Sequence, residues 1–217
     1  MLLVHGLPII AYSLRMLADA GFADVTINLH HLPEVVRDYV RDGSAFGLRV
    51  TYSDEPVLLG TAGALVPVAQ RFRTGTFAVV FGDNVIDLDL TAMLARHRAR
   101  GALATVAVCR RSDVSQSGVA ELSAEDRIMR FIEKPRAGET DSHWVNAGVV
   151  VCEPPVLDLI PRDRPSDLGR DVLPELATRG RAFAFRMGGR LWWFDRTEDY
   201  AGALADDALA AFAKRRS

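Results

Sequence analysis

The sequence predicts an α/β fold with a doubly wound, mixed sheet. In the first half, apolar strand-like runs alternate with amphipathic helical segments over short connections, which is typical of a parallel sheet covered by helices. After Cys109 the pattern changes to consecutive strands without long helices between them, which indicates mixed or antiparallel additions. The length of 217 residues suits one large domain or two small ones, and we expect the simpler arrangement, a single domain over residues 1–217.

The first half opens with a helix over Pro8–Gly21, because proline suits a first helical turn and glycine suits a C-cap. The β-branched run Asp24–His30 predicts a buried strand. The same reasoning from period and punctuation predicts the following elements: helix Leu32–Arg41, strand Leu48–Tyr52, helix Thr61–Phe72 interrupted by Pro67, strand Thr76–Phe81, helix Leu90–Arg100 ended by Gly101, and strand Leu103–Cys109.

In the second half the apolar alternation predicts mainly strands. The expected elements are strands Gly118–Leu122, Ile128–Glu133 and Val145–Cys152, helices at about Pro155–Leu159 and Leu168–Arg179, strands Arg181–Arg186 and Arg190–Phe194, and an alanine-rich closing helix Thr197–Lys214.

The strand at 76–81 is continuously apolar and ends abruptly in Gly82-Asp83-Asn84. Such a run predicts a strand buried on both faces. A carboxylate at the carboxyl end of such a strand stands where open α/β sheets bind ligands, and beside a glycine it is a natural Mg²⁺ ligand. The alternative is that Asp83 only caps or turns the strand end.

The composition indicates a soluble globular protein, with 49% hydrophobic and 25% charged residues. The net charge of −2 gives no strong field toward nucleic acid or an anionic membrane, so we expect neither partner. Cys109 and Cys152 each close an apolar run and are expected to act as small hydrophobes. With no membrane-spanning run or signal-peptide plan, a reducing cytoplasm fits best.

Five segments, taken in order, resemble the sugar-1-phosphate nucleotidyltransferases, also called nucleotide-sugar pyrophosphorylases. They are Leu59-Gly-Thr-Ala-Gly-Ala-Leu65, Gly82-Asp83-Asn84, Phe131-Ile-Glu-Lys-Pro135, Asn146-Ala-Gly148 and Trp193-Phe-Asp195. The stretch Ser166–Leu176 also resembles the branch of mannose- and heptose-1-phosphate guanylyltransferases. The resemblance implies a Rossmann-like fold of the nucleotide-diphospho-sugar transferase type.

The resemblance also implies a reaction. A nucleoside monophosphate passes from an NTP to a sugar 1-phosphate, and pyrophosphate leaves after in-line attack on the α-phosphorus. Asp83 and Asp195 match the family's Mg²⁺ ligands, and two carboxylates from separate strand ends suit one octahedral ion. The alternative for Asp195 is a cap on the closing helix, which it precedes by two residues.

On the sugar side, Lys134 matches the lysine that contacts the sugar 1-phosphate, and Glu133 matches a carboxylate that accepts bonds from sugar hydroxyls. Without the flanking motifs they would read as a surface ion pair before a proline turn. Asn146 and Gly148 match the sugar pocket, where a glycine allows close approach of the ring; a β-bulge is the alternative for Gly148.

On the nucleotide side, the loop Gly60, Thr61, Ala62 and Gly63 matches the segment beside the base, with backbone N–H groups aimed at it. Its alternative is a plain helix N-cap by Thr61. Gly82 and Asn84 flank Asp83 in the same candidate substrate site.

The chain departs from the family pattern in two places. Family members open with a strand and a glycine-rich loop around the NTP phosphates, whereas Met1–Pro8 resembles the segment after that loop. A lost strand is expected to leave unpaired sheet edges. Around Asp195 the turn is shorter than usual, and Arg196 would compete with Mg²⁺ for the carboxylate.

These departures leave two functions open. The first is an Mg²⁺-dependent sugar-1-phosphate nucleotidyltransferase, seen here as an N-terminally shortened domain. The second is a catalytically inactive subunit that binds a nucleotide sugar or regulates an active homologue. A more distant reading, a glycosyltransferase with an Asp-x-Asp motif at Asp87-Leu-Asp89, is weakened because Asp89 suits a helix N-cap. The base, the sugar and the oligomeric state, a homo-oligomer included, stay open.

Overall fold

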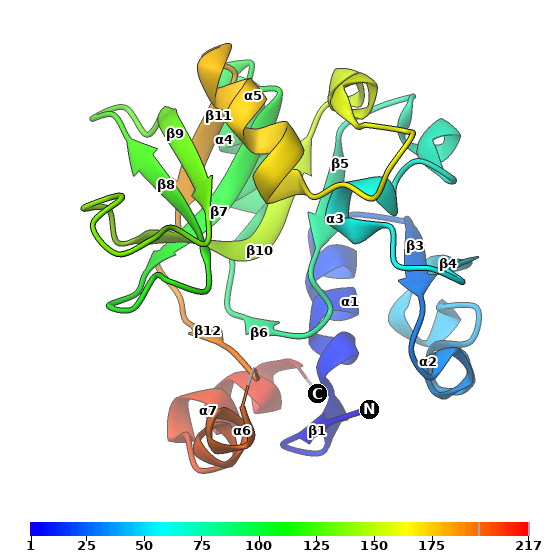
Figure 1. The fold of residues 1–217 in the computed structure, drawn as a ribbon. Helices are drawn as coiled ribbons and strands as arrows, with labels where there is room; N and C mark the ends of the chain where they lie inside the picture. Colours follow the sequence, from blue (N-terminus) through cyan, green and yellow to red (C-terminus); the bar gives the residue numbers. More distant parts are fainter. Residues whose placement is uncertain (195, 217) are drawn as a thin grey trace. The chain divides into compact units, whose positions relative to one another are not determined.

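The computed structural model describes residues 1–194 and 196–216, and its ribbon is shown in Figure 1. The chain divides into two compact units. The first unit comprises residues 1–54, 81–90 and 188–217, and the second comprises residues 55–80 and 91–187. Among the described residues, no helix is both long enough and apolar enough to cross a membrane.

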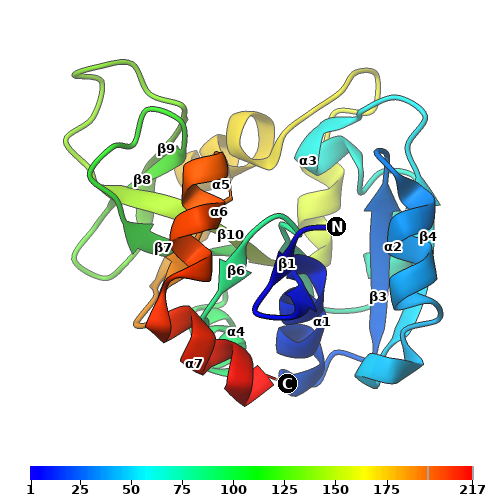
Figure 2. The ribbon, with the colours of Figure 1, turned by 90° about the horizontal axis from the view of Figure 1, so that it is seen from below.

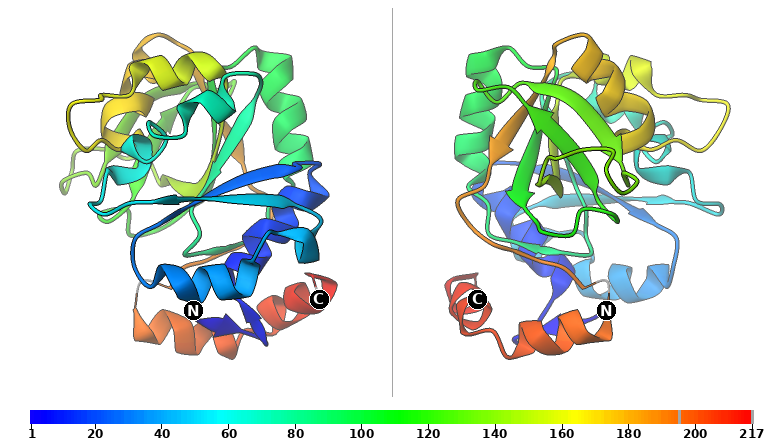
Figure 3. Two further views of the ribbon diagram at one scale, coloured as in Figure 1. Left: turned by 90° about the vertical axis from the view of Figure 1, so that its right-hand side faces the viewer. Right: turned by 60° about the vertical axis from the view of Figure 1, so that its left-hand side comes forward.

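The second unit is built on a six-stranded mixed sheet in the order β11-β7-β10-β8-β9, with β5 also paired to β10. Its strands are β5 (Phe77–Val80), β7 (Ala104–Arg110), β8 (Gly118–Leu122), β9 (Ile128–Glu133), β10 (Trp144–Cys152) and β11 (Ala182–Arg186). β11 runs parallel to β7, whereas β10 is antiparallel to β5, β7 and β8. The β8–β9 hairpin stands in the foreground of the right-hand view in Figure 3.

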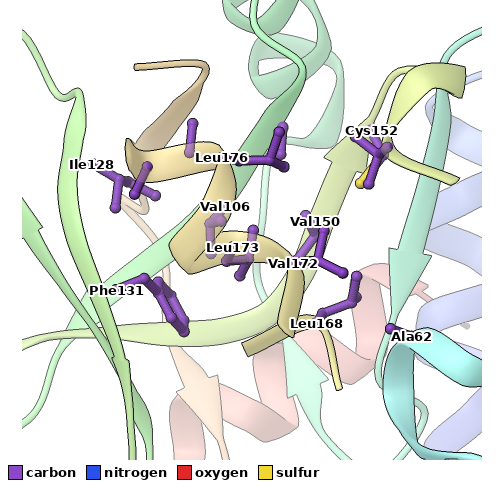
Figure 4. Packing of buried hydrophobic residues seen from close by; sticks show 14 of the residues in the cluster. Ala62, Val106, Ile128, Phe131, Val150, Cys152, Leu168, Val172, Leu173 and Leu176 are labelled. Atoms are coloured by element: carbon purple, nitrogen blue, oxygen red, sulfur yellow. The ribbon is translucent and has the colours of Figure 1, made fainter. Parts of the chain in front are cut away.

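The helices of the second unit are short apart from α4 (Leu90–Arg100), of which Leu90 is counted with the first unit. The others are α3 (Gly60–Gly63), η2 (Ala69–Phe72), η3 (Pro154–Leu159), the π-helical turn η4 (Leu168–Val172) and α5 (Leu173–Thr178). Figure 4 shows how apolar residues of η4 and α5 pack toward the sheet, with Leu168 beside Ala62 of α3. Leu168, Val172, Leu173 and Leu176 are at most 1% exposed, because they meet the buried side chains of β7, β9 and β10.

The first unit contains a parallel pair, β3 (Asp24–Leu29) and β4 (Arg49–Asp54), beside α1 (Ile9–Asp19) and α2 (Pro33–Val40). Figure 2 shows α2 running along this pair. The remaining elements are the hairpin β1 (Leu3–Val4) and β2 (Leu7–Pro8), η1 (Ser44–Phe46), the antiparallel pair β6 (Val85–Ile86) and β12 (Leu191–Trp192), α6 (Thr197–Leu204) and α7 (Asp207–Arg216). Phe212 of α7 stacks on Tyr12 and Trp192, which ties the C-terminal helix to α1 and β12.

The predicted α/β class with a mixed sheet is confirmed, and most predicted elements fall within a few residues of their place. Cys109 is half-buried and Cys152 is buried, and both are free thiols whose pKa burial raises to about 11 and about 12. Their predicted place as small apolar residues at strand ends is therefore confirmed.

Three predicted elements are wrong in detail. The strand at 76–81 is not buried on both faces: only Phe77 of β5 is buried, and β10 is its one strand partner among the described residues. The helix predicted over Thr61–Phe72 is reduced to α3, turns and η2, because Gly63 and Pro67 favour turns over a continued helix.

The closing helix is broken into α6 and α7 at Asp206. Oδ1 of Asp206 accepts the N–H groups of Ala208 at 2.7 Å and Leu209 at 3.1 Å, so this side chain caps α7. Capping competes with continuation because an aspartate bonds best to the free N–H groups of a helix start.

Candidate functional site

The Gly82–Asn84 segment forms a turn between β5 and β6 and belongs to the first unit. Asp83 is exposed, whereas Asn84 is only 9% exposed. The Asn84 amide Nδ2 donates to Oδ1 of Asp83 at 2.9 Å, so the buried neighbour orients the exposed carboxylate. This donor set offers a hard anionic oxygen of the kind that Mg²⁺ takes from proteins.

The second predicted metal ligand, Asp195, lies outside the described residues. Arg196, next to it, occupies the N-cap position of α6, and its N–H donates to Oδ2 of Asp199 at 3.0 Å. Within residues 1–194 and 196–216, no three His, Cys, Asp or Glu side chains gather in an arrangement suited to a metal ion.

Glu133 and Lys134 lie at the end of β9 in the second unit. Lys134 has a φ of 51°, a left-handed conformation that is costly for a residue with a side chain. Its N–H donates to the carbonyl of Ser117 at 3.0 Å, and its side chain is exposed. A strained backbone that presents a lysine at a strand end is typical of a ligand-contacting position.

Glu133 is half-buried, and burial raises the pKa of its carboxyl group. Lys134 and Arg170 lower this pKa, and Asp167 raises it, so these three charged groups face the carboxylate. A carboxylate in such surroundings suits an acceptor for hydroxyl groups, since a hydrogen bond is stronger at a partly buried site than in bulk water.

Asn146 and Gly148 form an irregularity in β10. The pairing of β10 with β7 shifts between Asn146 and Val150, and Gly148 has a φ of 83°. Oδ1 of Asn146 accepts the N–H of Gly148 at 2.9 Å. The bulge foreseen as an alternative is therefore present, and the Asn146 side chain is held within it by the N–H of Gly148.

The Gly60–Gly63 loop is bound to the segment Ser166–Leu168. The N–H groups of Ala62 and Gly63 donate to the carbonyl of Ser166 at 2.9 and 3.0 Å, and that of Thr61 donates to Oδ1 of Asp167 at 3.1 Å. The Thr61 hydroxyl in turn accepts the N–H of Leu168 at 2.9 Å. These N–H groups are used within the protein, so the expectation that they point at a nucleobase is wrong.

Gly60 is required for this arrangement. Its φ is 82°, and an added Cβ would lie 2.9 Å from the carbonyl carbon of Ser166 and 3.0 Å from Oδ1 of Asp167. Neither distance leaves room for a side chain. The glycine thus permits contact between two loop segments, in addition to any contact with a ligand.

The segment Ser166–Asp171 lies between two groups of predicted site residues in the second unit, the Gly60–Gly63 loop and the Glu133 end of β9. It contacts α3 on one side through Thr61 and β9 on the other through Glu133. Asp171 holds the segment in shape: its Oδ2 accepts the N–H of Asp167 at 2.8 Å, and its Oδ1 pairs with Arg164 at 2.6 Å.

Sequence reasoning missed the role of this segment, because Ser166–Leu176 carried only a family resemblance. The available signal was composition: Ser, Asp and Gly in a short polar run before an apolar helix are typical of a loop that bonds to another backbone. The contact itself joins residues more than a hundred positions apart and has no local signature.

Known proteins resemble the chain along most of its length. A model of the family described as nucleotidyl transferase matches residues 1–203. A UTP–glucose-1-phosphate uridylyltransferase of Synechocystis is 34% identical over 91% of this chain and 54% of its own length. A mannose-1-phosphate guanylyltransferase of Mycobacterium tuberculosis is 34% identical over 95% of this chain and 57% of its own length. The chain thus spans about half the length of these relatives.

The fold is shared with solved structures. The crystal structure of an apo UDP-glucose pyrophosphorylase superposes with a TM-score of 0.79 at 19% identity, covering 100% of this chain and 90% of the other. At 19% identity this likeness shows the fold alone, whereas the match to the family model shows the family. The resemblance seen in the motifs is confirmed: the chain belongs to the nucleotidyl transferase family.

Proposed function

We propose that this chain belongs to an Mg²⁺-dependent sugar-1-phosphate nucleotidyltransferase, which transfers a nucleoside monophosphate from an NTP to a sugar 1-phosphate and releases pyrophosphate. The observation that carries the proposal is the end of β9, where Lys134 is held at a φ of 51° beside the half-buried Glu133. The names of its relatives, a uridylyltransferase for glucose 1-phosphate and a guanylyltransferase for mannose 1-phosphate, support the same reaction class.

Each residue has a role that its chemistry supports. The Lys134 ammonium is a compact positive charge that suits the phosphate of a sugar 1-phosphate. The Glu133 carboxylate accepts hydrogen bonds from sugar hydroxyls, and the oriented Asn146 amide supplies a further polar contact. Binding the sugar phosphate in one orientation is what in-line transfer requires of these groups.

Asp83, with Asp195 as its proposed companion, would hold Mg²⁺. The ion, when bound, neutralises charge on the phosphate oxygens. Asp83 fits this role because its exposed carboxylate is oriented by Asn84 and because Mg²⁺ commonly takes only one or two carboxylates, with phosphate oxygens completing its shell.

The proposal is tested by pyrophosphate release. The purified chain is incubated with Mg²⁺, GTP or UTP, and mannose 1-phosphate or glucose 1-phosphate. We expect release that stops when the metal is chelated and falls about a hundredfold in Asp83→Ala and in Lys134→Ala. Asp163→Ala, an exposed carboxylate outside the site, serves as the matched control and should keep full activity.

The alternative, a binding or regulatory subunit without turnover, gives a different result. It would bind GDP-mannose or UDP-glucose in a calorimeter and release no pyrophosphate with any of the four substrate pairs. A chain that neither binds these nucleotide sugars nor releases pyrophosphate contradicts both functions.

A further inference from the structure

The carboxylate of Glu133 lies between two glycines that come from different elements. Gly118 of β8 stands directly opposite Glu133 in the β8–β9 pair, and Gly169 lies in η4. An added Cβ at Gly118 would lie 2.7 Å from Oε2 of Glu133. An added Cβ at Gly169 would overlap the same oxygen and lie 3.1 Å from Cδ. Neither position can carry a side chain while the carboxylate stays where it is.

The two glycines differ in what a methyl group would disturb. At Gly118 the added Cβ would also lie 2.7 Å from Cζ of Phe131, a ring that is only 4% exposed and fixed in the core. At Gly169 the overlap falls on the outer end of the Glu133 side chain, which can rotate away. Gly169 is absent from the described residues with a positive φ, so alanine can adopt its backbone conformation.

The surroundings of the carboxylate connect this contact to the rest of the site. Lys134 and Arg170 face Glu133 as cations, and Asp167 faces it as an anion. Asp167 also holds the Gly60–Gly63 loop through Thr61. The start of the η4 turn that carries Gly169 is therefore held to Thr61, and Asp171 of the turn accepts the N–H of Asp167, so the turn cannot move aside for a methyl group without straining those bonds.

From this geometry we propose that Gly169 is a positioning residue for Glu133. Because position 169 has no side chain, the Glu133 carboxylate can lie against the backbone of η4. This position of the carboxylate determines the affinity for the sugar part of the ligand. The proposal rests on the proposed function, because it needs Glu133 to contact the hydroxyls of a sugar 1-phosphate or a nucleotide sugar. It predicts an effect on the sugar part alone, since the proposed function assigns Glu133 to the sugar hydroxyls and not to the nucleotide.

The test compares Gly169→Ala with the unchanged chain by calorimetry. The probes are GDP-mannose and UDP-glucose, each measured against the matching GDP or UDP. We expect a nucleotide sugar to bind about tenfold more weakly, which corresponds to the loss of one charge-assisted hydrogen bond. The binding of the nucleoside diphosphate should be unchanged. Gly75→Ala is the matched control, because an added Cβ at that exposed glycine meets nothing within 4 Å.

A double-mutant cycle separates positioning from a structural effect. In the Glu133→Ala background the methyl group at position 169 has no carboxylate to displace, so it should weaken binding by less than about twofold. A structural disturbance of η4 would instead cost the same factor in both backgrounds.

A conservative second variant covers the case in which Gly169→Ala alone is poorly folded. Glu133→Asp shortens the acid by one methylene, so the pair Gly169→Ala with Glu133→Asp should regain the native circular dichroism spectrum and part of the affinity for the nucleotide sugar. Failure of this rescue overturns the positioning role.

The remaining outcomes are distinguishable. If the unchanged chain binds neither the nucleotide sugars nor the nucleoside diphosphates, the proposed function fails and the positioning role falls with it. If the unchanged chain binds a nucleotide sugar and Gly169→Ala binds it equally well, only the positioning role is overturned.

Discussion

At the scale of single residues, the structure contains a buried polar cluster that the proposed reaction does not use. His97 of α4 is 1% exposed; its Nδ1 lies 2.8 Å from the Thr105 hydroxyl, and its Nε2 lies 3.1 Å from Oε1 of Glu153. The same Glu153 oxygen accepts the Thr76 hydroxyl at 2.7 Å. The cluster ties α4 to β7 and to the residue that follows β10, so its protonation state bears on the stability of the second unit.

Acid should destabilise this cluster. Burial lowers the pKa of His97 more than Glu153 raises it, so the folded protein favours the neutral imidazole. The unfolded chain binds a proton at about pH 6.5, so the unfolding free energy should fall as the pH drops below that value. Urea titrations between pH 8 and pH 5 check this decline, which should be reduced in His97→Gln.

The unfolding free energy of the same variant should be about 1–3 kcal/mol lower at neutral pH, because Thr105 and Glu153 each lose the hydrogen bond to His97. His31→Gln, at an exposed histidine, is the control and should keep the pH dependence of the unchanged chain. A His97→Gln variant with that same acid dependence would show that other groups cause it.

Lys134 should show a conflict between stability and binding. Lys134→Gly removes the cost of a side chain at positive φ and should stabilise the chain by about 1 kcal/mol, whereas Lys134→Ala keeps that cost. Both variants should bind mannose 1-phosphate or glucose 1-phosphate more weakly, because both lose the ammonium group. Urea denaturation and calorimetry measure the two effects, and equal stability of the glycine and alanine variants would show that the backbone is not strained there.

At the scale of elements, the α3 loop and the residues that lead into η4 act as one piece, because the backbone of the loop bonds to the backbone of Ser166. The carbonyl of Ser166 accepts two N–H groups of the loop, and the Ser166 N–H donates to the carbonyl of Leu59 at 2.8 Å. Asp167 adds the side-chain contacts to Thr61. Backbone bonds therefore hold Ala62 and Gly63, whereas the Asp167 side chain holds Thr61.

Asp167→Ala should therefore loosen the loop unevenly. The amide of Thr61 loses its acceptor and should exchange with deuterium about tenfold faster or more, while the amides of Ala62 and Gly63 keep the Ser166 carbonyl and should change less. Exchange measured by NMR checks each amide, with Asp163→Ala as control. Equal acceleration at all three amides would mean that Asp167 supports the whole loop.

Elements with a local sequence signal were predicted well, whereas contacts between distant parts of the chain were not. Periodicity and punctuation are local, so α1, α4, β7 and β9 were predicted within a residue or two. The β10 bulge was foreseen only as an alternative, because one glycine inside an apolar run also suits a close approach to a ligand. The Glu133–Lys134 pair was found through its motif, whereas the glycines around it became visible only in three dimensions.

At the scale of the whole molecule, the stability of the second unit rests on β10, which pairs with β5, β7 and β8. Val150 lies in the carboxyl-terminal part of β10, opposite Val79 on one side and Val106 on the other, and is 0% exposed. The neighbouring strands leave little freedom for collapse around a smaller side chain, so a deletion here acts on the whole sheet.

Val150→Ala should cost about 2–3 kcal/mol, since it removes two buried methyl groups and leaves a cavity between paired strands. Val57→Ala makes the same chemical change at a residue that is 68% exposed, and should alter stability by less than about 0.5 kcal/mol. Urea denaturation measures both, and similar losses in the two variants would contradict the central place of β10.

The place of β10 between β5 and β7 also bears on how the polypeptide reaches its native state during synthesis. β5 and β7 leave the ribosome before β10, the strand with which both of them pair. Val80 of β5, for example, pairs with Val149 of β10. Contacts of such long sequence separation slow folding, because loop closure precedes any gain from pairing. Until β10 leaves the ribosome, the apolar edges of β5 and β7 stand open to wrong partners, so the nascent chain is at its most aggregation-prone just before this strand arrives.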